Sequence, residues 1–306
     1  MKEWVSLIPN TVHLIWIGDQ EYPDYFKLFL KSYELHMPEF TVKVWGNKEL
    51  TKKNFPLTYD YIKKAKKIHG TLMYDEDSGK QLYKEEGKNL VPMKHSKWAQ
   101  ITDLMRLEII YNHGGYYFDT TFEILQPLYT LFNKKHYKFV GCNEVPRFKN
   151  FPALTNAFFG AVKKSVILKR LLTKKSLSNI DFTSYRIEDE TGPEYLRSAI
   201  KESDKGVKIF PTTYFYPFIE PVDSYNDSPF RKSSLNKCHK KTLRKSKKSQ
   251  KSQRSQKSQK YKKLNSNKGY ILYPCKNYPK SYALKHWQLG GSWYWWNSFI
   301  LDDDDY

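Results

Sequence analysis

Cysteine is scarce in this sequence. The three cysteines are Cys142, Cys238 and Cys275. This number is small and odd, so it does not fit the disulfide framework of a small secreted protein. None lies in a Cys-x-x-Cys pair or a Cys/His cluster, so the sequence predicts no structural zinc site. The low count favours a reducing compartment.

Long apolar runs are also missing. No stretch approaches the roughly 20 apolar residues that a membrane-spanning helix needs. The first residues, MKEWVSLIPNTVHLIWIG, contain neither a long apolar run nor a small-residue cleavage site, so we predict no signal peptide. We therefore expect a soluble, cytoplasmic protein without a transmembrane segment. Association with a membrane by other means stays open.

Acidic residues are absent from one long segment. Residues 231–268 contain 16 Lys or Arg and no Asp or Glu, while the whole chain carries a formal charge of +20. The remainder has 36 basic and 32 acidic residues, so it is nearly balanced. The segment's centre, SKKSQKSQRSQKSQK, buries no apolar surface and repels itself. We predict a core over residues 1–227, a disordered Lys/Ser/Gln-rich insertion over 228–268, and the C-terminal part of the core with an acidic tail over 269–306.

The start of the chain predicts a strand, a helix and a second strand. Residues 8–17 form an apolar run closed by Gly18, residues 25–36 carry apolar side chains at helical spacing, and residues 40–45 form a second β-rich run. This order indicates a βαβ unit and a parallel sheet in an α/β domain. We expect further strands at 138–141, 157–162 and 207–211, and helices at 165–172 and 194–202.

The segment from residue 97 to residue 125 combines structural and chemical signals. Apolar spacing predicts a helix over residues 97–112, which the glycines after His113 end. A short strand, YYFDTTFEIL, is expected to follow. Asp103 and Arg106 lie one helical turn apart. The Gly-Gly turn can bring both to one cleft with Asp119 on the strand, where ligands of α/β sheets bind.

Residues 102–121, TDLMRLEIIYNHGGYYFDTT, resemble the [ST]-D-x-x-R…G-G-x-Y-x-D-x-D signature of DXD-type glycosyltransferases with a GT-A fold. The resemblance is to the family 32 sugar-binding-region enzymes, which include mannosyl- and galactosyltransferases, and more distantly to the glucosylating bacterial toxins. IPNTVHLIWIG, the Thr-Gly-Pro loop and KHWQLGGSW resemble other family segments in the expected order. The resemblance implies a single Rossmann-like nucleotide-sugar-binding domain with a mostly parallel mixed central sheet and flanking helices.

The resemblance implies roles in donor binding for four residues. Trp16 resembles the aromatic residue that stacks on the nucleotide base, and a flat indole face suits that role. Asp103 and Arg106 resemble the pair that grips the donor sugar, where an arginine can also stabilise phosphate charge. Tyr117 matches the motif tyrosine two residues before the first aspartate of the DXD.

Two outer segments also match family motifs. Ser292 and Trp293, in the C-terminal segment, resemble residues that close over the pyrophosphate. Thr191, Gly192 and Pro193 resemble the family's Thr-Gly-Pro loop and are candidates for the acceptor side. Taken without the family pattern, each of these residues has a simpler structural explanation as part of a turn or of the packed core.

Asp119 resembles the first aspartate of a DXD motif, which implies a Mn²⁺ or Mg²⁺ ion bridging the donor phosphates. His286 is the second expected ligand, because imidazole can complete a Mn²⁺ shell. The motif departs from the family at Thr121, which replaces the second aspartate. If residues 119, 121 and 123 share one strand face, Thr121 and Glu123 are further candidate ligands. One carboxylate fewer predicts weaker metal binding.

The sequence therefore predicts an enzyme that moves a hexose from a UDP- or GDP-sugar to a glycan, lipid or protein hydroxyl, with retention of configuration. Thr121 motivates an alternative, a catalytically inactive sugar- or nucleotide-binding relative. A basic nucleic-acid-binding protein is the third hypothesis, because the insertion can bind phosphate backbones. The basic segment 231–268 has one aromatic residue, Tyr261, and thus lacks the stacking residues of single-strand binders. We therefore expect no specific nucleic-acid partner.

Overall fold

The computed structural model describes residues 6–18, 20–75, 78–86, 89–143, 154–184, 186–216 and 281–285. The predicted insertion, residues 228–268, lies outside this part of the chain. His286, Ser292 and Trp293 lie outside it too. The proposed division of the chain into core and insertion therefore stays a prediction.

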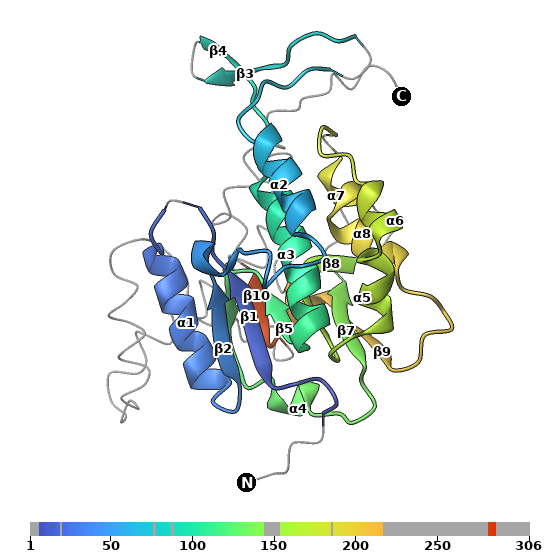
Figure 1. Cartoon of the computed structure of the whole chain (residues 1–306). Helices are drawn as coiled ribbons and strands as arrows, with labels where there is room; N and C mark the ends of the chain where they lie inside the picture. The colour runs from blue at the N-terminus through green and yellow to red at the C-terminus, as the bar shows by residue number, and fades with distance from the viewer. Residues whose placement is uncertain are drawn as a thin grey trace, which may run out of the picture.

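A six-stranded mixed sheet forms the centre of the molecule (Figure 1), in the order β2-β1-β5-β8-β7-β9. Strand β8 is antiparallel to β5 and β7, and the other three pairings are parallel. The predicted α/β class with a mostly parallel mixed sheet and flanking helices is confirmed. The strands are β1 Thr11–Ile15, β2 Thr41–Trp45, β5 Gly115–Phe118, β7 Phe139–Asn143, β8 Leu154–Ala161 and β9 Val207–Phe210.

Helices cover both faces of this sheet. One hydrophobic core lies under α2, α3, α5, α6 and α8, and a second lies under α1, α4 and residues 210–216. Figure 1 shows α3 crossing the sheet, with α2 above it and α5 to α8 beside it. The helices are α1 Asp24–His36, α2 Tyr59–Ile68, α3 Trp98–His113, α4 Tyr129–Phe132, α5 Val166–Leu171, α6 Lys174–Ser178, α7 Ile187–Glu190 and α8 Pro193–Ser198, with short 3₁₀ turns at Asn47–Glu49 and Thr212–Tyr214.

Helix α3 is buried around most of its circumference, including its charged residues. The Glu108 carboxylate accepts hydrogen bonds from the backbone N–H groups of Leu57 and Thr58, at 2.9 and 2.8 Å, and from the Thr58 hydroxyl at 2.6 Å. These bonds fix the start of α2 against α3. A buried carboxylate with three donors is satisfied, so the central helix can carry polar residues without an unpaired charge.

The expected single strand over residues 116–125 is wrong. The chain makes a turn after β5, in which the Phe122 N–H donates to the Asp119 carbonyl at 3.1 Å. A separate strand, β6 (Phe122–Ile124), then pairs antiparallel with β10 (Ala283–Lys285). Asp119, Thr121 and Glu123 therefore do not share one strand face, because the first two lie in the turn.

The predicted glycine turn between α3 and β5 is confirmed. Gly114 and Gly115 both have positive φ, at 68° and 97°, which favours glycine. His13 contacts the Gly114 carbonyl through Nε2 at 3.0 Å, and the Trp45 indole donates to its Nδ1 at 3.1 Å. Burial lowers the pKa of His13 to about 3. The neutral ring therefore donates from Nε2 to Gly114 and holds the turn against β1 and β2.

We expect Gly115→Ala to destabilise the fold by about 3 kcal/mol, through backbone strain and overpacking. A Cβ at Gly115 would collide with the Thr11 carbonyl oxygen and lie 3.1 Å from His13 Nε2. Gly70→Ala is the matched control, because Gly70 has φ of 81° and open space around its Cβ position. Denaturant unfolding measures both variants. Equal losses at the two positions would contradict the close approach of β5 to β1.

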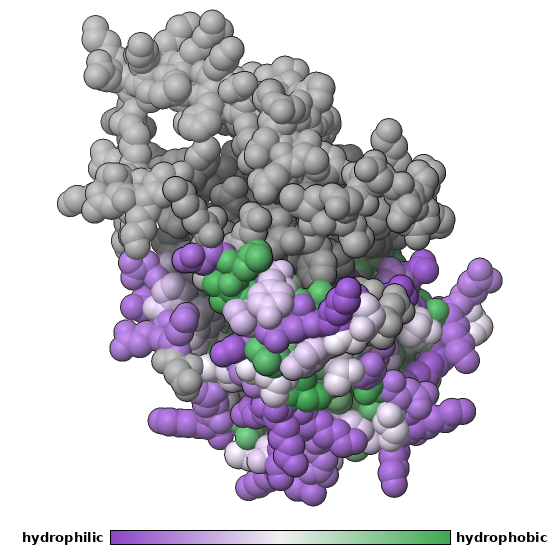
Figure 2. Space-filling view, turned by 90° about the horizontal axis from the view of Figure 1, so that it is seen from above, coloured by the Kyte–Doolittle hydropathy of each residue, from purple (hydrophilic) through white to green (hydrophobic). Residues whose placement is uncertain are grey.

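A hairpin of β3 (Tyr83–Glu86) and β4 (Asn89–Pro92) projects beyond α2 (Figure 1). Hydrophilic side chains dominate the rim of the described surface seen from that end, with smaller hydrophobic areas between them (Figure 2).

None of the helices in the described ranges is both long and apolar enough to cross a membrane.

Candidate active site

Two of the predicted site residues follow parallel strands that lie side by side. Trp16 comes directly after β1, and Asp119 directly after β5. The two strands pair in parallel, with Val12 opposite Tyr116 and His13 opposite Tyr117. Their carboxyl ends therefore meet at one edge of the sheet, the edge at which α/β proteins bind ligands.

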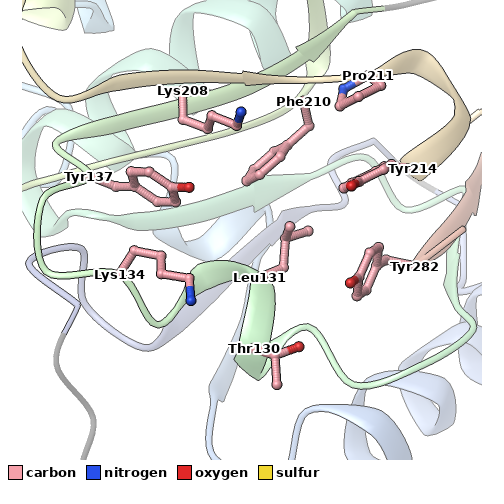
Figure 3. A pocket seen from close by; sticks show the side chains of 9 residues that line it. All are labelled: Thr130, Leu131, Lys134, Tyr137, Lys208, Phe210, Pro211, Tyr214 and Tyr282. Atoms are coloured by element: carbon pink, nitrogen blue, oxygen red, sulfur yellow. The ribbon is translucent and has the colours of Figure 1, made fainter. Parts of the chain in front are cut away.

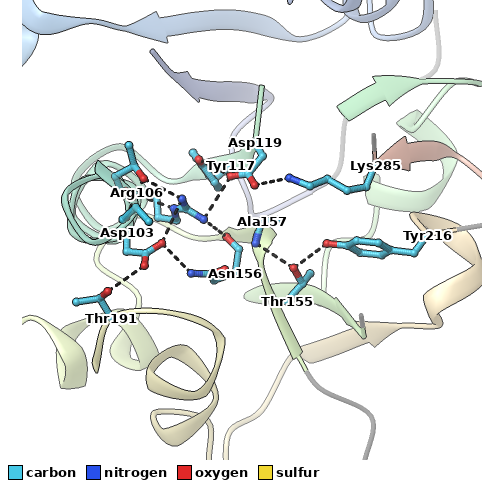
Figure 4. A network of polar contacts seen from close by, with 12 residues as sticks. Asp103, Arg106, Tyr117, Asp119, Thr155, Asn156, Ala157, Thr191, Tyr216 and Lys285 are labelled. Atoms are coloured by element: carbon cyan, nitrogen blue, oxygen red, sulfur yellow. Dashed lines mark hydrogen bonds and ion pairs between the residues drawn. The ribbon is translucent and has the colours of Figure 1, made fainter. Parts of the chain in front are cut away.

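Helix α3 brings a carboxylate and a guanidinium to this edge (Figure 4). Arg106 lies 3.2 Å from Asp103 Oδ1 and 3.4 Å from Asp119 Oδ1, through Nη2 and Nη1 respectively. The side chains of Asp103 and Arg106 are 5% and 7% exposed, whereas that of Asp119 is 25% exposed. The structure thus joins three predicted residues in one network, in which Asp119 is the member that reaches solvent.

The five N–H groups of the Arg106 guanidinium have protein acceptors in range. Nε donates to the Thr102 carbonyl at 3.3 Å, Nη1 to the Asn156 carbonyl at 2.8 Å, and Nη2 to the Thr102 hydroxyl at 3.2 Å, besides the two carboxylates. The guanidinium also lies over the Tyr117 ring, 4.5 Å from its centre. With these contacts, Arg106 acts as a positioning residue that holds Asp103 and Asp119 in place.

Asp103 is surrounded by hydrogen-bond donors. Asn156 Nδ2 donates to Oδ1 at 2.8 Å, and the Thr191 hydroxyl donates to Oδ2 at 2.9 Å. Burial raises the pKa of Asp103 to about 6, although Arg106 and the Thr191 hydroxyl oppose the shift. All of these partners donate, so the network matches the ionised carboxylate.

Asp119 accepts hydrogen bonds at both carboxylate oxygens. The Tyr117 hydroxyl donates to Oδ1 at 2.8 Å, and Lys285 Nζ donates to Oδ2 at 2.5 Å. Burial alone raises the pKa of Asp119, but the Lys285 ammonium and the Arg106 guanidinium outweigh it and hold the pKa below its usual range. Asp119 is therefore a carboxylate balanced by two nearby cations.

Sequence reasoning missed Lys285 and Asn156. Lys285 directly precedes the KHW motif's histidine, so the C-terminal motif marked its neighbourhood but not its role. Asn156 lies in the middle of β8, without a motif around it. Its backbone carbonyl and its side chain hold Arg106 and Asp103 respectively.

Trp16 lies at the edge of the second core. Its ring stacks on Phe26 at 5.5 Å between centres, meets Tyr22 edge-on at 6.0 Å, and donates from Nε1 to the Gln20 carbonyl at 2.9 Å. The side chain is half-buried. These contacts orient the indole, and stacking of a nucleotide base on it stays a prediction.

The Thr-Gly-Pro loop joins α7 to α8 and reaches the network through Thr191. A Cβ at Gly192 would lie 2.8 Å from the Glu188 Cα, so the loop needs glycine for close approach to α7. Pro193 begins α8, at a position where its missing N–H costs no helical hydrogen bond. The loop expected on the acceptor side is therefore tied to Asp103.

Residues 1–139 match the family described as glycosyltransferase sugar-binding region containing a DXD motif. The match includes Trp16, Asp103, Arg106 and Asp119, whereas Lys285 lies beyond it. It supports sugar transfer in general. A search of curated proteins finds no match.

Several solved glycosyltransferase structures resemble this chain distantly. The PaToxG glycosyltransferase is 15% identical over 63% of this chain and 67% of its own, with a TM-score of 0.42. Mouse xyloside xylosyltransferase 1, in its apo form, is 8% identical over 72% and 91%, with a TM-score of 0.42. The UDP-bound glycosyltransferase domain of the YGT toxin is 12% identical over 66% and 79%, with a TM-score of 0.39.

Glycosyltransferases with a DXD motif generally use a divalent metal, but the described residues do not fit one. Thr121 stands at the second acidic position, and its buried hydroxyl has no hydrogen-bond partner in the described part of the chain. Both Asp119 oxygens already accept from other side chains, and Glu123 is buried on β6. Within the described ranges, no three His, Cys, Asp or Glu side chains form a group that could hold a metal. The expected ligand His286 lies outside those ranges.

A hollow lies away from this network (Figure 3). Its volume is about 360 Å³, and Tyr137, Tyr214 and Tyr282 line it together with Lys134 and Lys208. None of its lining residues belongs to the Asp103–Arg106–Asp119 network. It offers aromatic faces and two ammonium groups, and so provides an alternative place at which an anionic ligand could bind.

Proposed function

We propose that this chain is a glycosyltransferase that moves a hexose from a UDP- or GDP-sugar to an acceptor hydroxyl, with retention at the anomeric carbon. The observation that carries the proposal is the buried Asp103–Arg106–Asp119 network at the carboxyl ends of β1 and β5, inside the matched residues 1–139. Asp119 is the most exposed member of this network, at 25%, so a bound donor can reach it.

The reaction exchanges one bond to the anomeric carbon for another. The bond from C1 to the donor's terminal phosphate oxygen breaks, and its electron pair stays on that oxygen. The acceptor oxygen bonds to C1 and loses its proton, which the departing phosphate oxygen takes up from the same face. The products are a glycoside and a nucleoside diphosphate. The developing negative charge on the diphosphate needs cations close by.

In this proposal the described residues divide the work. Trp16 lies against the base, and Asp119 faces the diphosphate. Arg106 holds Asp119 in place, and Asp103 and Arg106 face the donor sugar. Thr191 links the same network to the acceptor side. The Mn²⁺ or Mg²⁺ ion implied by the resemblance has no part in this division, because the donor set at Asp119 does not fit it.

The test is release of nucleoside diphosphate from a panel of UDP- and GDP-sugars, with and without simple glycan acceptors, by the full chain. We expect turnover with at least one donor, and loss of that turnover in Asp103→Asn. Asp204→Asn is the matched control, because Asp204 pairs with Arg170 at 2.7 Å, in an ion pair that includes no residue of the network. Absence of turnover across the panel, with nucleoside diphosphate still bound, would favour the inactive relative that Thr121 suggests.

The raised pKa of Asp103 predicts a pH dependence. Below about pH 6 the carboxyl becomes protonated, so kcat/KM for the donor should fall as the pH drops through that value. Thr191→Val removes a hydroxyl whose hydrogen bond favours the charged form of Asp103. The pH at which kcat/KM falls should therefore rise by about half to one unit. Thr191→Ser keeps the hydroxyl and should leave this pH unchanged. An unchanged pH profile in the valine variant would show that protonation of Asp103 does not cause the fall in kcat/KM.

A further inference from the structure

Lys285 is held firmly beside Asp119. Strand β10 places it opposite Phe122 of β6, and its backbone N–H donates to the Phe215 carbonyl at 3.2 Å. The side chain is 7% exposed, and Nζ lies 5.4 Å from the centre of the Phe122 ring. Because both the backbone and the stem are fixed by neighbours, the ammonium has a defined position beside Asp119 (Figure 4).

The charges around Asp119 can be compared with those of a full DXD motif. Two aspartates with a divalent ion carry two negative and two positive charges. Here Thr121 stands in place of the second aspartate, and Lys285 supplies a single positive charge to Asp119, the carboxylate that remains. Asp103 and Arg106 balance each other in both arrangements, so the net charge is zero in both. The ammonium therefore offsets the charge difference that would arise from losing both the second aspartate and the divalent ion.

An ammonium also has suitable chemistry for a diphosphate. It carries three N–H donors, so it can hold Asp119 and a phosphate oxygen at the same time. Charge-assisted hydrogen bonds to phosphate are among the strong ones. Arg106 cannot easily replace Lys285 in this role, because its own N–H groups face Thr102, Asn156 and the two carboxylates.

We propose, on the basis of the function proposed above, that Lys285 takes the place of the divalent metal: its ammonium binds the donor diphosphate and stabilises the leaving nucleoside diphosphate. When the C1–O bond breaks, the electron pair remains on the terminal phosphate oxygen next to Nζ. Asp119 then serves to orient the ammonium. Neither binding nor transfer requires a divalent ion.

Binding measured by titration calorimetry, in excess EDTA, tests this role without relying on turnover. The probes are UDP, GDP and inorganic pyrophosphate, and the protein is the full chain. We expect the wild type to bind at least one probe, and Lys285→Met to bind it about 10- to 100-fold more weakly, as loss of one charge-assisted hydrogen bond predicts. Lys285→Arg should retain most of the affinity. Lys27→Met, which removes an exposed lysine from α1, controls for general charge.

Removal of the Lys285 side chain should also create a response to metal. With Lys285→Ala, the carboxylate of Asp119 loses its ammonium, so Mn²⁺ should strengthen probe binding in this variant and leave the wild type unchanged. Adding Thr121→Asp to Lys285→Ala should enlarge the response, because it supplies a second carboxylate. Unfolding curves of each variant confirm that the fold is retained.

Three results would overturn the role of Lys285. They are wild-type binding that disappears in EDTA and returns with Mn²⁺, unchanged affinity in Lys285→Met, and no binding of any probe by the wild type. Failure of the proposed function has a different signature. In that case, probe binding depends on Lys285 in EDTA, but no donor sugar is turned over.

Discussion

Replacing Arg106 by methionine is expected to lower the free energy of unfolding by about 3–5 kcal/mol, because it strips the cation from a buried charge network. Asp103 and Asp119 both lose their guanidinium contact, and the Asn156 carbonyl loses its donor at 2.8 Å. Turnover should be lost as well, since Asp103 loses its cation and Asp119 keeps only Tyr117 and Lys285 as partners. Denaturant unfolding and nucleoside diphosphate release measure the two effects.

Two further substitutions make this result interpretable. Arg170→Met removes a guanidinium that also pairs with an aspartate, Asp204, but is 29% exposed. It should cost about 1 kcal/mol at most and leave turnover intact. Arg106→Lys keeps one positive charge and should fold, but it loses the planar fork that reaches Asp103 through Nη2 and Asp119 through Nη1. Wild-type turnover in Arg106→Lys would show that this fork is unnecessary.

Asp119→Asn is expected to reduce kcat about 100-fold, which corresponds to about 2.7 kcal/mol of transition-state stabilisation. The amide keeps the shape of the side chain, but it no longer attracts the Lys285 ammonium that lies 2.5 Å away. Affinity for UDP or GDP should stay the same or increase, because a negative charge near the diphosphate is gone. Steady-state kinetics and calorimetry separate these two effects.

The direction of the affinity change distinguishes two roles for Asp119. If the carboxylate were a metal ligand, its loss would weaken both catalysis and nucleotide binding, and Mn²⁺ would no longer help. If it orients Lys285, only catalysis suffers. The matched control Asp204→Asn should change neither quantity, because Asp204 pairs with Arg170 outside the network.

Much of the fold could be predicted because its signals are local. The apolar spacing along α3 and the two glycines after it specify a helix, a sharp turn and a strand within a short stretch of chain. The order of β1, α1 and β2 likewise predicts parallel pairing. Helix α2 was not predicted, because only Ile62 and Ala65 of its ten residues are buried and lysines occupy four of the other eight positions.

The parts that escaped prediction depend on distant contacts. The segment YYFDTTFEIL has high β-propensity throughout, but β10 pairs with only its second half, so the chain turns at Asp119 and leaves the main sheet. Lys285 meets Asp119 across 166 positions of the sequence, and Asn156 meets Asp103 across 53. No spacing rule links such residues, because tertiary packing alone brings them together.

The most direct measurement of the central claim is a structure of the full chain with UDP or GDP bound in the presence of EDTA. The account predicts the diphosphate at the carboxyl ends of β1 and β5, within hydrogen-bonding distance of Lys285 Nζ, and the base against Trp16. A nucleotide bound instead in the hollow lined by Tyr137, Tyr214 and Tyr282 would contradict it, because the Asp103–Arg106–Asp119 network would then serve only the stability of the fold.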